Sequence, residues 1–589
     1  MCKELKTVKD VVLRNSGLEE AEFDKAFFDE ASNTNLPIKN LDEAAQLIIT
    51  EAWKGTPIHI VGDYDVDGVL GTSTIFLSVS EITPNVTYRI PKRMSEGYGL
   101  KPSIIDEIDS GLLITVDNGI AAYDAIKKAK EKGLKVVVVD HHLLGANKMP
   151  PADVIVDPHV INYGDDDFQD YCGAGLAYRL ACKLIPGHPL LEKLLCYAAI
   201  ATIADSVPLK RENRFIVKNG LLNMVQKEKR TNGLGALLNV YNLQRYINEK
   251  DIAFRIAPAI NAPGRLYDDG AKEPVKLFTS KGSFEECTEL ANYLYDTNRK
   301  RIEMKDKFIE IAHDMIKKEM LFNSAPIVLA SDEFHEGLAG IIAGKITEEY
   351  RVPAIVLCML EDGETYKGSG RSVEDVDLFK LIEKHKDMLP TFGGHKMACG
   401  LSVKKKDLSD FICALESDME DYVPKSLAGS ITYDLVIQGT DVDEAMNEVR
   451  KYAPYGEGNP EIVFKIENYR LSPKGSSVYE TKGANDSTIL LNGMNSSAIG
   501  FFMTDDYMKE GQPKNLTIVG TIRDKYKVPI FKPSASYTPK KSSSSKRSGT
   551  KKEVERETQV EILTMKKAEM PVRKTSLAEM LSQMSQDRK

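Results

Sequence analysis

The sequence lacks the features of membrane, secreted and zinc-ribbon proteins. No apolar run approaches the roughly 20 residues that span a bilayer, and the first residues lack the apolar core of a signal peptide. The eight cysteines are scattered with no Cys-x-x-Cys pair, which argues against a zinc ribbon and predicts reduced thiols in a cytoplasmic protein. The formal net charge of −9 argues against a uniformly basic coat, so any nucleic acid would have to follow a local basic track.

Three short apolar runs, each followed by polar residues, organise the first third of the chain. They are residues 58–61, 112–116 and 136–139, with helix-like segments at 69–81 and 120–132. Continuous β-branched runs that alternate with helices are typical of buried parallel strands in an α/β fold. Because parallel strands present their carboxyl ends on one edge of the sheet, the polar residues after them should meet there. Those residues are Asp63, Asp65, Asp67, Asp117, Asp140, His141 and His142.

This set of side chains predicts a site for divalent metal ions. Carboxylates that lie close together raise one another's pKa unless cations neutralise them. Carboxylates with one or two imidazoles suit Mn²⁺ or Mg²⁺, and a pair of such ions would activate water and hold a phosphate. The simpler alternative is that Asp, Asn and Gly only form turns, which explains one such motif better than three on consecutive strands. An EF-hand loop shares Asp-x-Asp-x-Asp-Gly, but its final glutamate is absent here.

Asp140-His141-His142, with the acidic motifs before it, resembles the DHH phosphoesterase superfamily. Asp205 lies in what looks like a fourth motif of that superfamily, and Gly393-Gly394-His395 resembles the domain that follows DHH domains. Over roughly residues 50 to 535 the chain resembles the RecJ branch, the single-strand-specific 5′ exonucleases. The residues behind this resemblance are Arg93 with Glu96-Gly97-Tyr98-Gly99, Gly173-Ala174-Gly175, Asn261 with Gly264-Arg265, His335-Glu336-Gly337, Ser369-Gly370-Arg371-Ser372 and Tyr455-Gly456-Glu457-Gly458-Asn459-Pro460. Cys399 and Leu143-Leu144 depart from the family pattern only by small or apolar changes.

The resemblance implies a role for each residue at the predicted site. Asp63 and Asp65 would hold one metal ion, while Asp67, His141 and Asp205 would hold the other. Asp117 would bridge both ions, Asp140 would orient His141, and His142 would face the scissile phosphate and stabilise its developing charge. His59 lies inside a strand and is expected to be a packed residue. The residues implied to bind phosphate or DNA are Arg93, Arg265, Ser369, Arg371, Gly394 and His395.

The pattern of elements divides the chain into six parts. Short amphipathic helices (1–51) are expected beside the metal domain (52–227), and a helical connector (228–324) follows. In the connector, two prolines predict an irregular segment at 257–269, and a single long helix at 284–319 is expected to bridge domains. A second α/β domain, similar to DHHA1 domains, spans 325–429. Short strands between turn signals at 430–538 predict a small barrel that resembles an OB-fold, with most of its aromatic residues in the core.

Residues 539–589 are rich in Ser and Lys, which predicts a disordered basic tail. Within it, Ser576 and Glu579 form a capping box ahead of apolar residues at helical spacing, which predicts a short helix. The helix would either dock on a partner or pack on the protein's own surface, or it would have no role.

Taken with the resemblance, these features predict an exonuclease that removes mononucleotides from the 5′ end of single-stranded DNA in repair and recombination. The expected cofactors are two Mn²⁺ or Mg²⁺ ions. The expected partner is single-stranded DNA, with a single-stranded-DNA-binding protein or a helicase as candidate protein partners, and the protein is expected to be a monomer without a membrane anchor. One alternative is a phosphodiesterase for short oligonucleotides or cyclic dinucleotides, which would not need the barrel. The other is a binding protein with an inactive DHH domain, which would have lost the acidic residues.

Overall fold

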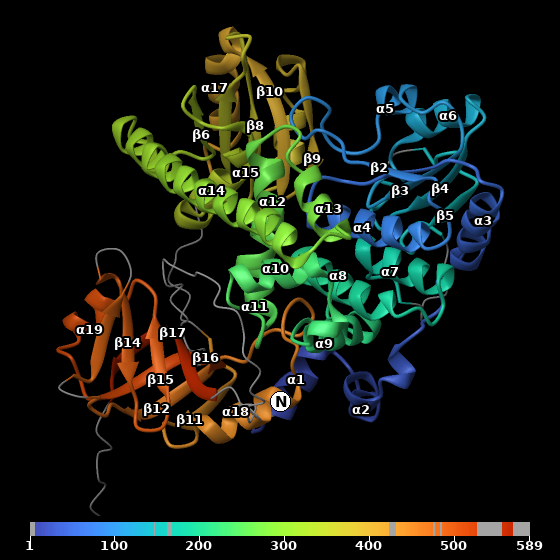
Figure 1. The fold of residues 1–589 in the computed structure, drawn as a ribbon. Helices are drawn as coiled ribbons and strands as arrows, with labels where there is room; N and C mark the ends of the chain where they lie inside the picture. The colour runs from blue at the N-terminus through green and yellow to red at the C-terminus, as the bar shows by residue number, and fades with distance from the viewer. Residues whose placement is uncertain are drawn as a thin grey trace, which may run out of the picture. The chain divides into compact units, whose positions relative to one another are not determined.

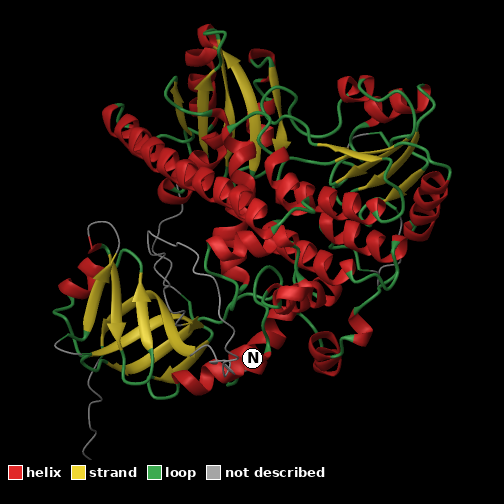
Figure 2. Ribbon diagram, viewed as in Figure 1, coloured by secondary structure: helices red, strands yellow, loops and turns green. Residues whose placement is uncertain are grey.

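The computed structural model describes residues 6–145, 148–161, 168–422, 432–474, 477–482, 486–526 and 556–568. They belong to two compact units, shown in Figure 1 and, by secondary structure, in Figure 2. The larger unit comprises Asp24–Gly429 and Gly456–Gly458, and the smaller comprises Met1–Phe23, Ser430–Tyr455 and Asn459–Lys589. Within the described ranges, every helix is too short or too polar to span a lipid bilayer.

A five-stranded parallel sheet forms the first half of the larger unit, in the order β2-β1-β3-β4-β5. The predicted parallel strands are confirmed, and their continuous β-branched runs are buried from end to end in β3. The strands are β1 (Ile58–Val61), β2 (Val86–Arg89), β3 (Leu112–Val116), β4 (Lys135–Val139) and β5 (Val154–Val156).

Helices cover both faces of this sheet (Figure 1). Apolar side chains of α3 (Leu41–Trp53), α4 (Val66–Ser80) and α7 (Gly173–Leu184) bury one face, and those of α5 (Pro102–Asp106) and α6 (Tyr123–Glu131) bury the other. Since both faces are covered, the carboxyl edge of the strands is the part of the sheet left to form a site.

A layer of helices lies behind α4 and α7 and shares one apolar core with them. It consists of α8 (Leu190–Ala204), α9 (Arg211–Met224), α10 (Asn232–Val240), α12 (Ala257–Leu266) and α13 (Lys272–Thr279). The short α11 (Glu249–Asp251) precedes α12 and buries no side chain. A π-helical turn, Ile252–Ile256, joins α11 to α12.

The prediction of an irregular segment at 257–269 is wrong over the ten residues of α12. Pro258 follows directly after the π-helical turn, where the hydrogen-bond spacing changes and Ala257 N donates to the Ile252 carbonyl. Pro263 lies inside the helix and leaves one carbonyl without its usual partner, which surrounding packing tolerates because Ala262, Pro263 and Gly264 are all buried.

The long connector helix is confirmed as α14 (Phe284–Lys318). It begins with a capping box, in which Ser283 accepts from the N–H of Glu286 and the Glu286 side chain accepts from the N–H of Ser283. Its first half packs against α10 and α12, and its second half packs in the core of the next domain through Phe308, Ala312 and Ile316. The helix therefore connects the two halves of the larger unit.

The second half of the larger unit is a five-stranded sheet in the order β6-β7-β8-β10-β9. β6 and β7 are parallel, and the other neighbours are antiparallel. Helix α15 packs with α14 on one face, and α16 and α17 pack on the other. The elements are β6 (Ile327–Ser331), α15 (Glu336–Tyr350), β7 (Ala354–Met359), β8 (Thr365–Arg371), α16 (Leu378–Glu383), β9 (Thr391–His395), β10 (Ala398–Lys404) and α17 (Leu408–Asp418).

The smaller unit is built on a seven-stranded sheet in the order β11-β12-β16-β17-β15-β14-β13. Its core holds Phe464, Tyr469 and Tyr507, all fully buried, as expected for aromatic residues of a small β-domain. The elements are β11 (Leu435–Gln438), α18 (Val442–Lys451), β12 (Phe464–Arg470), β13 (Tyr479–Lys482), β14 (Thr488–Asn492), β15 (Ser497–Gly500), α19 (Thr504–Lys509), β16 (Asn515–Tyr526) and β17 (Arg556–Lys567).

The N-terminal helices were expected to lie beside the metal domain, but not all of them do. α1 (Val8–Ser16) packs against α18 in the smaller unit, where Arg14 forms an ion pair with Asp434. α3 packs on the parallel sheet of the larger unit, and the boundary between the units falls within α2 (Glu20–Phe28). The amphipathic pattern predicted the helices correctly but did not identify the surface that each one covers.

The prediction of disorder throughout 539–589 is wrong for β17. This strand pairs antiparallel with β16 and parallel with β15, and buries Val560 and Ile562 in the sheet. The Lys- and Ser-rich composition of the surrounding chain conceals a short run in which apolar and polar residues alternate, from Val560 to Ile562. The expected docking helix near Ser576 lies outside the described residues.

Candidate metal centre

The first acidic loop joins β1 to α4 and is held by the ends of two helices. The Asp65 side chain caps α4 by accepting from the N–H groups of Asp67 and Gly68, at 3.0 and 3.1 Å. The Asp67 carboxylate accepts from Gly173 N and Ala174 N at the start of α7, at 2.6 and 2.7 Å. Helix N-termini favour negative charge, so both carboxylates sit where the backbone stabilises them. A side chain at Gly68 would meet the Asp63 backbone at 2.6 Å, which explains the glycine.

Asp117 follows β3 in a left-handed backbone conformation, with φ of 60°. This conformation is uncommon for residues other than glycine, although Asp tolerates it better than most, and such geometry is found at functional sites. It lets the buried Asp117 carboxylate reach His141, with 3.1 Å between Oδ1 and Nε2. Gly173 lies against Asp117, and a side chain there would approach the Asp117 Cβ to 2.7 Å.

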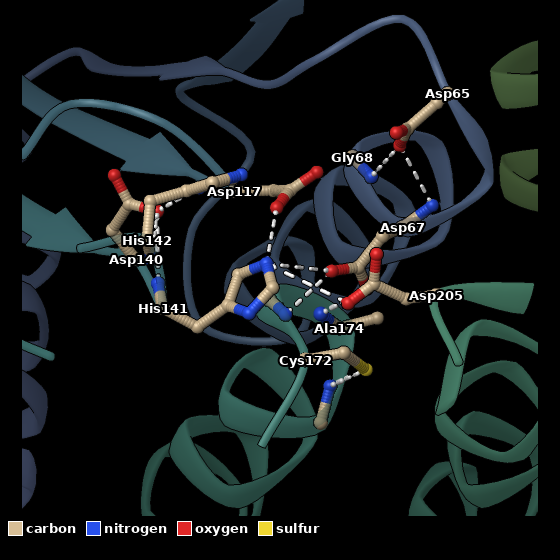
Figure 3. A network of polar contacts seen from close by, with 12 residues as sticks. Asp65, Asp67, Gly68, Asp117, Asp140, His141, His142, Cys172, Ala174 and Asp205 are labelled. Carbon is tan, nitrogen blue, oxygen red and sulfur yellow. Dashed lines mark hydrogen bonds and ion pairs between the residues drawn. The ribbon is translucent and has the colours of Figure 1, made fainter. Parts of the chain in front are cut away.

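His141 lies at the centre of the cluster (Figure 3). Its Nε2 lies 3.6 Å from an Asp67 oxygen and 3.8 Å from an Asp205 oxygen, in addition to its contact with Asp117. Three groups of side chains each have their possible ligand atoms within 4.8 Å of one another. They are Asp67, His141 and Asp205; Asp63, Asp65 and Asp117; and Asp117, His141 and His142. The structure thus brings together all six residues that the sequence predicts as metal ligands, with Asp117 of one set touching His141 of the other.

The structure places Asp140 against the ring of His142 rather than that of His141. Asp140 Oδ1 lies 2.7 Å from His142 Nδ1 and also accepts from the backbone N–H of His141 at 2.8 Å, while Oδ2 accepts from Ile120 N. Asp140 thus meets His141 at its backbone N–H, and its side-chain contact goes to His142 instead of to the expected ring of His141. The sequence order Asp-His-His did not reveal which ring turns back to the carboxylate.

The pKa values of the acidic groups show a strong need for positive charge. Burial, then the neighbouring Asp67, raise the pKa of Asp205 from its ordinary 3.8 to about 8. Burial and nearby carboxylates also raise the pKa of Asp63 and Asp117. Asp63 Oδ1 is buried with no hydrogen-bond partner among the described residues. A cluster of carboxylate oxygens and one imidazole that needs positive charge suits one or two hard divalent ions.

His142, unlike these carboxylates, is stabilised in its charged form. Burial acts to lower its pKa, but the hydrogen bond and charge of Asp140 outweigh burial and raise the pKa to about 9. Burial lowers the pKa of His141. The pair therefore separates into a neutral imidazole suited to a metal and an imidazolium suited to an anion.

Three supporting residues were not predicted from the sequence. The Tyr98 hydroxyl lies 3.2 Å from His142 Nε2 and 3.4 Å from the Asp117 carbonyl. His159 Nδ1 lies 2.6 Å from the His141 carbonyl, and the Asp157 carboxylate accepts from His159 N. Asp157 and His159 follow β5 directly, so the rule that polar residues after parallel strands meet at one edge would have found them. His59, expected to be a packed residue, contacts Thr87 and the Ser110 carbonyl.

Three arginines implied to bind phosphate lie within electrostatic reach of one another. Burial, then the nearby charges of Arg93, Arg301 and Arg371, lower the pKa of Arg265 from 12.5 to about 10. The Arg93 guanidinium stacks on Tyr64, 4.5 Å from the ring centroid. Arg371 donates to Ser369 Oγ at 2.7 Å and to the Gly370 carbonyl at 2.8 Å. Like charges that are buried together favour binding of an anion such as phosphate.

Gly394 and His395 lie on β9, the exposed edge of the second sheet. His395 pairs with Ala398 on β10, and Ala398 pairs in turn with Arg371 on β8. The three residues form one row across neighbouring strands, so His395 lies on the same end of the sheet as Ser369 and Arg371.

Three family models match successive parts of the chain. The DHH family N-terminal domain matches residues 57–202, the DHHA1 domain matches 323–421 and the RecJ OB domain matches 433–526. The matched segments contain the parallel sheet, the second sheet of the larger unit and, except for β17, the sheet of the smaller unit.

Curated relatives and a solved structure agree with these models. The single-stranded-DNA-specific exonuclease RecJ of Bacillus subtilis is 36% identical over 73% of this chain, and the match spans 54% of its own length. The RecJ protein of Haemophilus influenzae is 32% identical over 72% of this chain and 77% of its own. A crystal structure of Thermus thermophilus RecJ in complex with Mn²⁺ matches 95% of this chain and 76% of its own, with a TM-score of 0.71 and 23% identity, and shows the same fold. The chain belongs to the RecJ family.

Proposed function

We propose that this protein is a single-stranded-DNA-specific exonuclease that hydrolyses phosphodiester bonds from the 5′ end and releases mononucleotides. The observation that carries the proposal is the pair of ligand sets joined at Asp117 and His141, with the cluster of Arg93, Arg265 and Arg371 nearby. A metal centre beside an anion site is what cleavage of a terminal phosphodiester needs. The names of its curated relatives support the same activity.

Asp63, Asp65 and Asp117 would hold one divalent ion, and Asp67, His141 and Asp205 would hold a second. When bound, the ions would polarise the scissile phosphate and lower the pKa of a water molecule. Oxygen and imidazole donors suit both Mn²⁺ and Mg²⁺.

The chain's own residues position the substrate and balance its charge. His142, protonated at neutral pH and fixed by Asp140, would donate to a phosphate oxygen and stabilise the charge that develops there. Arg371 and Ser369 would hold the terminal phosphate of the strand, with Arg93 and Arg265 on phosphates near the metal centre. His395 and the backbone of Gly394 would line the same end of the second sheet. If the phosphate that Arg371 and Ser369 hold is the 5′ phosphate, cleavage proceeds from the 5′ end.

The smaller unit favours a polymeric substrate over a dinucleotide. Domains that match an OB model bind single strands by stacking bases on aromatic residues. Phe502 is 83% exposed and Phe501 is 46% exposed, which leaves two aromatic faces for such contacts. We also propose that the protein acts as a cytoplasmic monomer, with a single-stranded-DNA-binding protein or a helicase as its partner during repair and recombination.

Digestion of end-labelled single strands with Mn²⁺ tests the proposal. Strands labelled at the 5′ or the 3′ end, with and without a 5′ phosphate, are incubated with the protein and with Asp205→Asn as a matched inactive variant. The expected result is immediate release of labelled mononucleotide from 5′-labelled strands only. Degradation limited to dinucleotides or cyclic dinucleotides would support the alternative phosphodiesterase, and no hydrolysis of any of these would contradict both.

A further inference from the structure

The loop of residues 91–99 carries two groups that reach the proposed active centre. Arg93 stacks on Tyr64, which lies between Asp63 and Asp65 in sequence. Tyr98 lies 3.2 Å from His142 Nε2. The loop contains no helix or strand and includes two glycines in left-handed conformations. Something outside the loop must therefore fix the positions of Arg93 and Tyr98.

Asp268 contacts the middle of this loop from a distant part of the sequence. Its Oδ1 accepts from Met94 N at 2.8 Å and from Ser95 N at 3.0 Å, and its Oδ2 accepts from the Ser95 hydroxyl at 2.6 Å. Its backbone carbonyl also accepts from Arg93 N at 3.3 Å. Successive N–H groups that converge on one carboxylate form an anion nest, and bonds to an ionised acceptor are the stronger kind.

The position of Asp268 links the loop to the arginine cluster. Asp268 lies two residues beyond the end of α12, and Arg265 lies in the last turn of that helix. Burial opposes ionisation of Asp268, but its bonds from Ser95 and Met94 outweigh burial and hold its pKa below the ordinary value. One short segment thus places Arg265 near Asp65 and also holds the loop that carries Arg93.

Besides the contacts of Arg93 and Tyr98 themselves, side chains of Arg89 and Lys367 also hold the loop, and neither replaces Asp268. Arg89 forms a bidentate pair with Glu96, at 2.6 and 2.8 Å, which fixes the loop to its own sheet. Lys367 of β8 donates to the Met94 carbonyl at a longer 3.4 Å. All of these contacts fall between Arg93 and Tyr98, but Asp268 is the residue that binds three successive backbone N–H groups of the loop, those of Arg93, Met94 and Ser95.

We propose that Asp268 is a positioning residue of the reaction, holding the loop of residues 91–99 so that Arg93 contacts the substrate strand and Tyr98 orients His142. The catalytic part of this inference depends on the proposed nuclease function, whereas the holding of the loop does not. Because the loop buries little apolar surface, loss of Asp268 should loosen the loop without unfolding the protein.

Hydrogen exchange measures the loop without any substrate. The full chain is compared with Asp268→Ala, Asp268→Asn and the neighbouring Asp269→Ala, whose side chain pairs only with Lys272 among the contacts that the structure describes. The peptide that contains residues 92–98 should exchange faster in Asp268→Ala and less so in Asp268→Asn, whose amide oxygen can still accept both N–H bonds. Unchanged exchange of this peptide in Asp268→Ala would overturn the proposal, whatever the nuclease assay shows.

Single-turnover digestion of single-stranded DNA measures the consequence for the reaction. Asp268→Ala should lower kcat/KM by roughly ten- to a hundredfold, the value of one or two charge-assisted contacts, and Asp269→Ala should stay within about twofold of the unmodified chain. In an Arg93→Ala/Tyr98→Phe background, Asp268→Ala has nothing left to position and should change the rate less than twofold. The same large loss in both backgrounds would show that Asp268 acts only on general stability. Inactivity of the unmodified chain would instead refute the nuclease function.

Discussion

At the residue scale, the metal centre consists of acids that the backbone holds in place before any ion binds. Asp65 and Asp67 accept from N–H groups at the starts of α4 and α7, and Asp117 adopts an uncommon backbone conformation that turns its carboxylate inward. Side chains fixed in this way lose little freedom when a cation arrives, so their positions favour binding.

Asp117→Ala should abolish cleavage while leaving the protein folded. Asp117 belongs to two of the candidate ligand groups, one with Asp63 and Asp65 and one with His141 and His142, so its loss should disturb both proposed ion sites. Without metal, removing a buried acid from a cluster of like charges should leave stability unchanged or increased. Digestion assays and thermal unfolding of Asp117→Ala, beside the exposed Asp124→Ala, test this. Activity within about tenfold of the unmodified chain, only about 1.4 kcal/mol of barrier, would refute the two-metal assignment.

Arg371→Ala should reduce the preference for 5′-phosphorylated ends more than it reduces binding to DNA overall. The guanidinium is partly buried beside Ser369, where a charge-assisted contact to a terminal phosphate is worth about 1.5–3 kcal/mol. The measurement is the ratio of cleavage rates on phosphorylated and hydroxyl ends, with the exposed Arg351→Ala as a control from the same domain. An unchanged ratio would place the end pocket elsewhere.

Removal of metal should make stability fall as pH rises. The folded, metal-free protein raises the pKa of Asp205 from 3.8 to about 8, so between these values it binds more protons than the unfolded chain. The stability that this proton provides is complete below about pH 4 and lost as pH passes about 8. The thermal midpoint in EDTA should therefore decrease from pH 5 to pH 8, and Mn²⁺ should raise it more at pH 8. A flat or rising midpoint in EDTA would contradict the assignment.

At the element scale, the sequence predicted elements whose pattern is long or continuous. The β-branched runs of β3 and β4 and the 35 residues of α14 were found because each repeats one signal over its whole length. The predicted ligands Asp63, Asp65, Asp67 and Asp117 were found because they follow strands, whereas Asp205 ends α8 and was found by resemblance alone. Asp268 could not be found in this way, since its contacts join residues that are 173 and 174 positions apart.

The local sequence pattern did not predict α12 or β17, because tertiary contacts outweighed it in both. α12 continues past Pro263 because its buried face packs against α14 and α15. β17 was missed because its few apolar residues lie in a chain whose average composition predicts disorder, and its pairing partner β16 ends thirty residues earlier, at Tyr526. Tertiary contacts decide such cases, and single-sequence patterns do not contain them.

Ile562→Ala should destabilise the smaller unit by about 2–5 kcal/mol. Ile562 is 3% exposed, in a strand with neighbours on both sides, so truncation leaves a cavity in the sheet. The next residue, Leu563, is 40% exposed, and Leu563→Ala should cost much less. Urea unfolding of the two variants tests the assignment of β17. Equal effects would mean that this strand is not part of the core.

At the scale of the whole molecule, the metal centre and the OB-type sheet belong to separate compact units. The larger unit has its own apolar cores around both of its sheets. Gly456–Gly458 belongs to it as well, through a hydrogen bond from Leu209 N to the Glu457 carbonyl at 2.7 Å.

A chain of residues 24–429 lacks only Gly456–Gly458 of the larger unit, so it should fold and retain metal-dependent cleavage of short single strands. It should bind long strands at least about tenfold more weakly, because stacking on exposed aromatic residues is worth about 1–3 kcal/mol per base. Fluorescence anisotropy with strands of increasing length, beside the full chain, measures the difference. Equal affinity for every length would mean that the smaller unit takes no part in binding DNA.

The smaller unit is built from segments that come before and after the larger unit in the chain, and this affects the order of folding during synthesis. α1 is synthesised first, but α18, the helix on which it packs, comes more than four hundred residues later, and β17 later still. At about 5–20 residues per second, a ribosome needs on the order of a minute to cover that interval. The larger unit lies between and can fold during this time, while α1 waits with Val8, Val11 and Val12 uncovered. The nascent chain therefore folds its metal centre first, and α1, the first helix to be synthesised, finds its packing partner last.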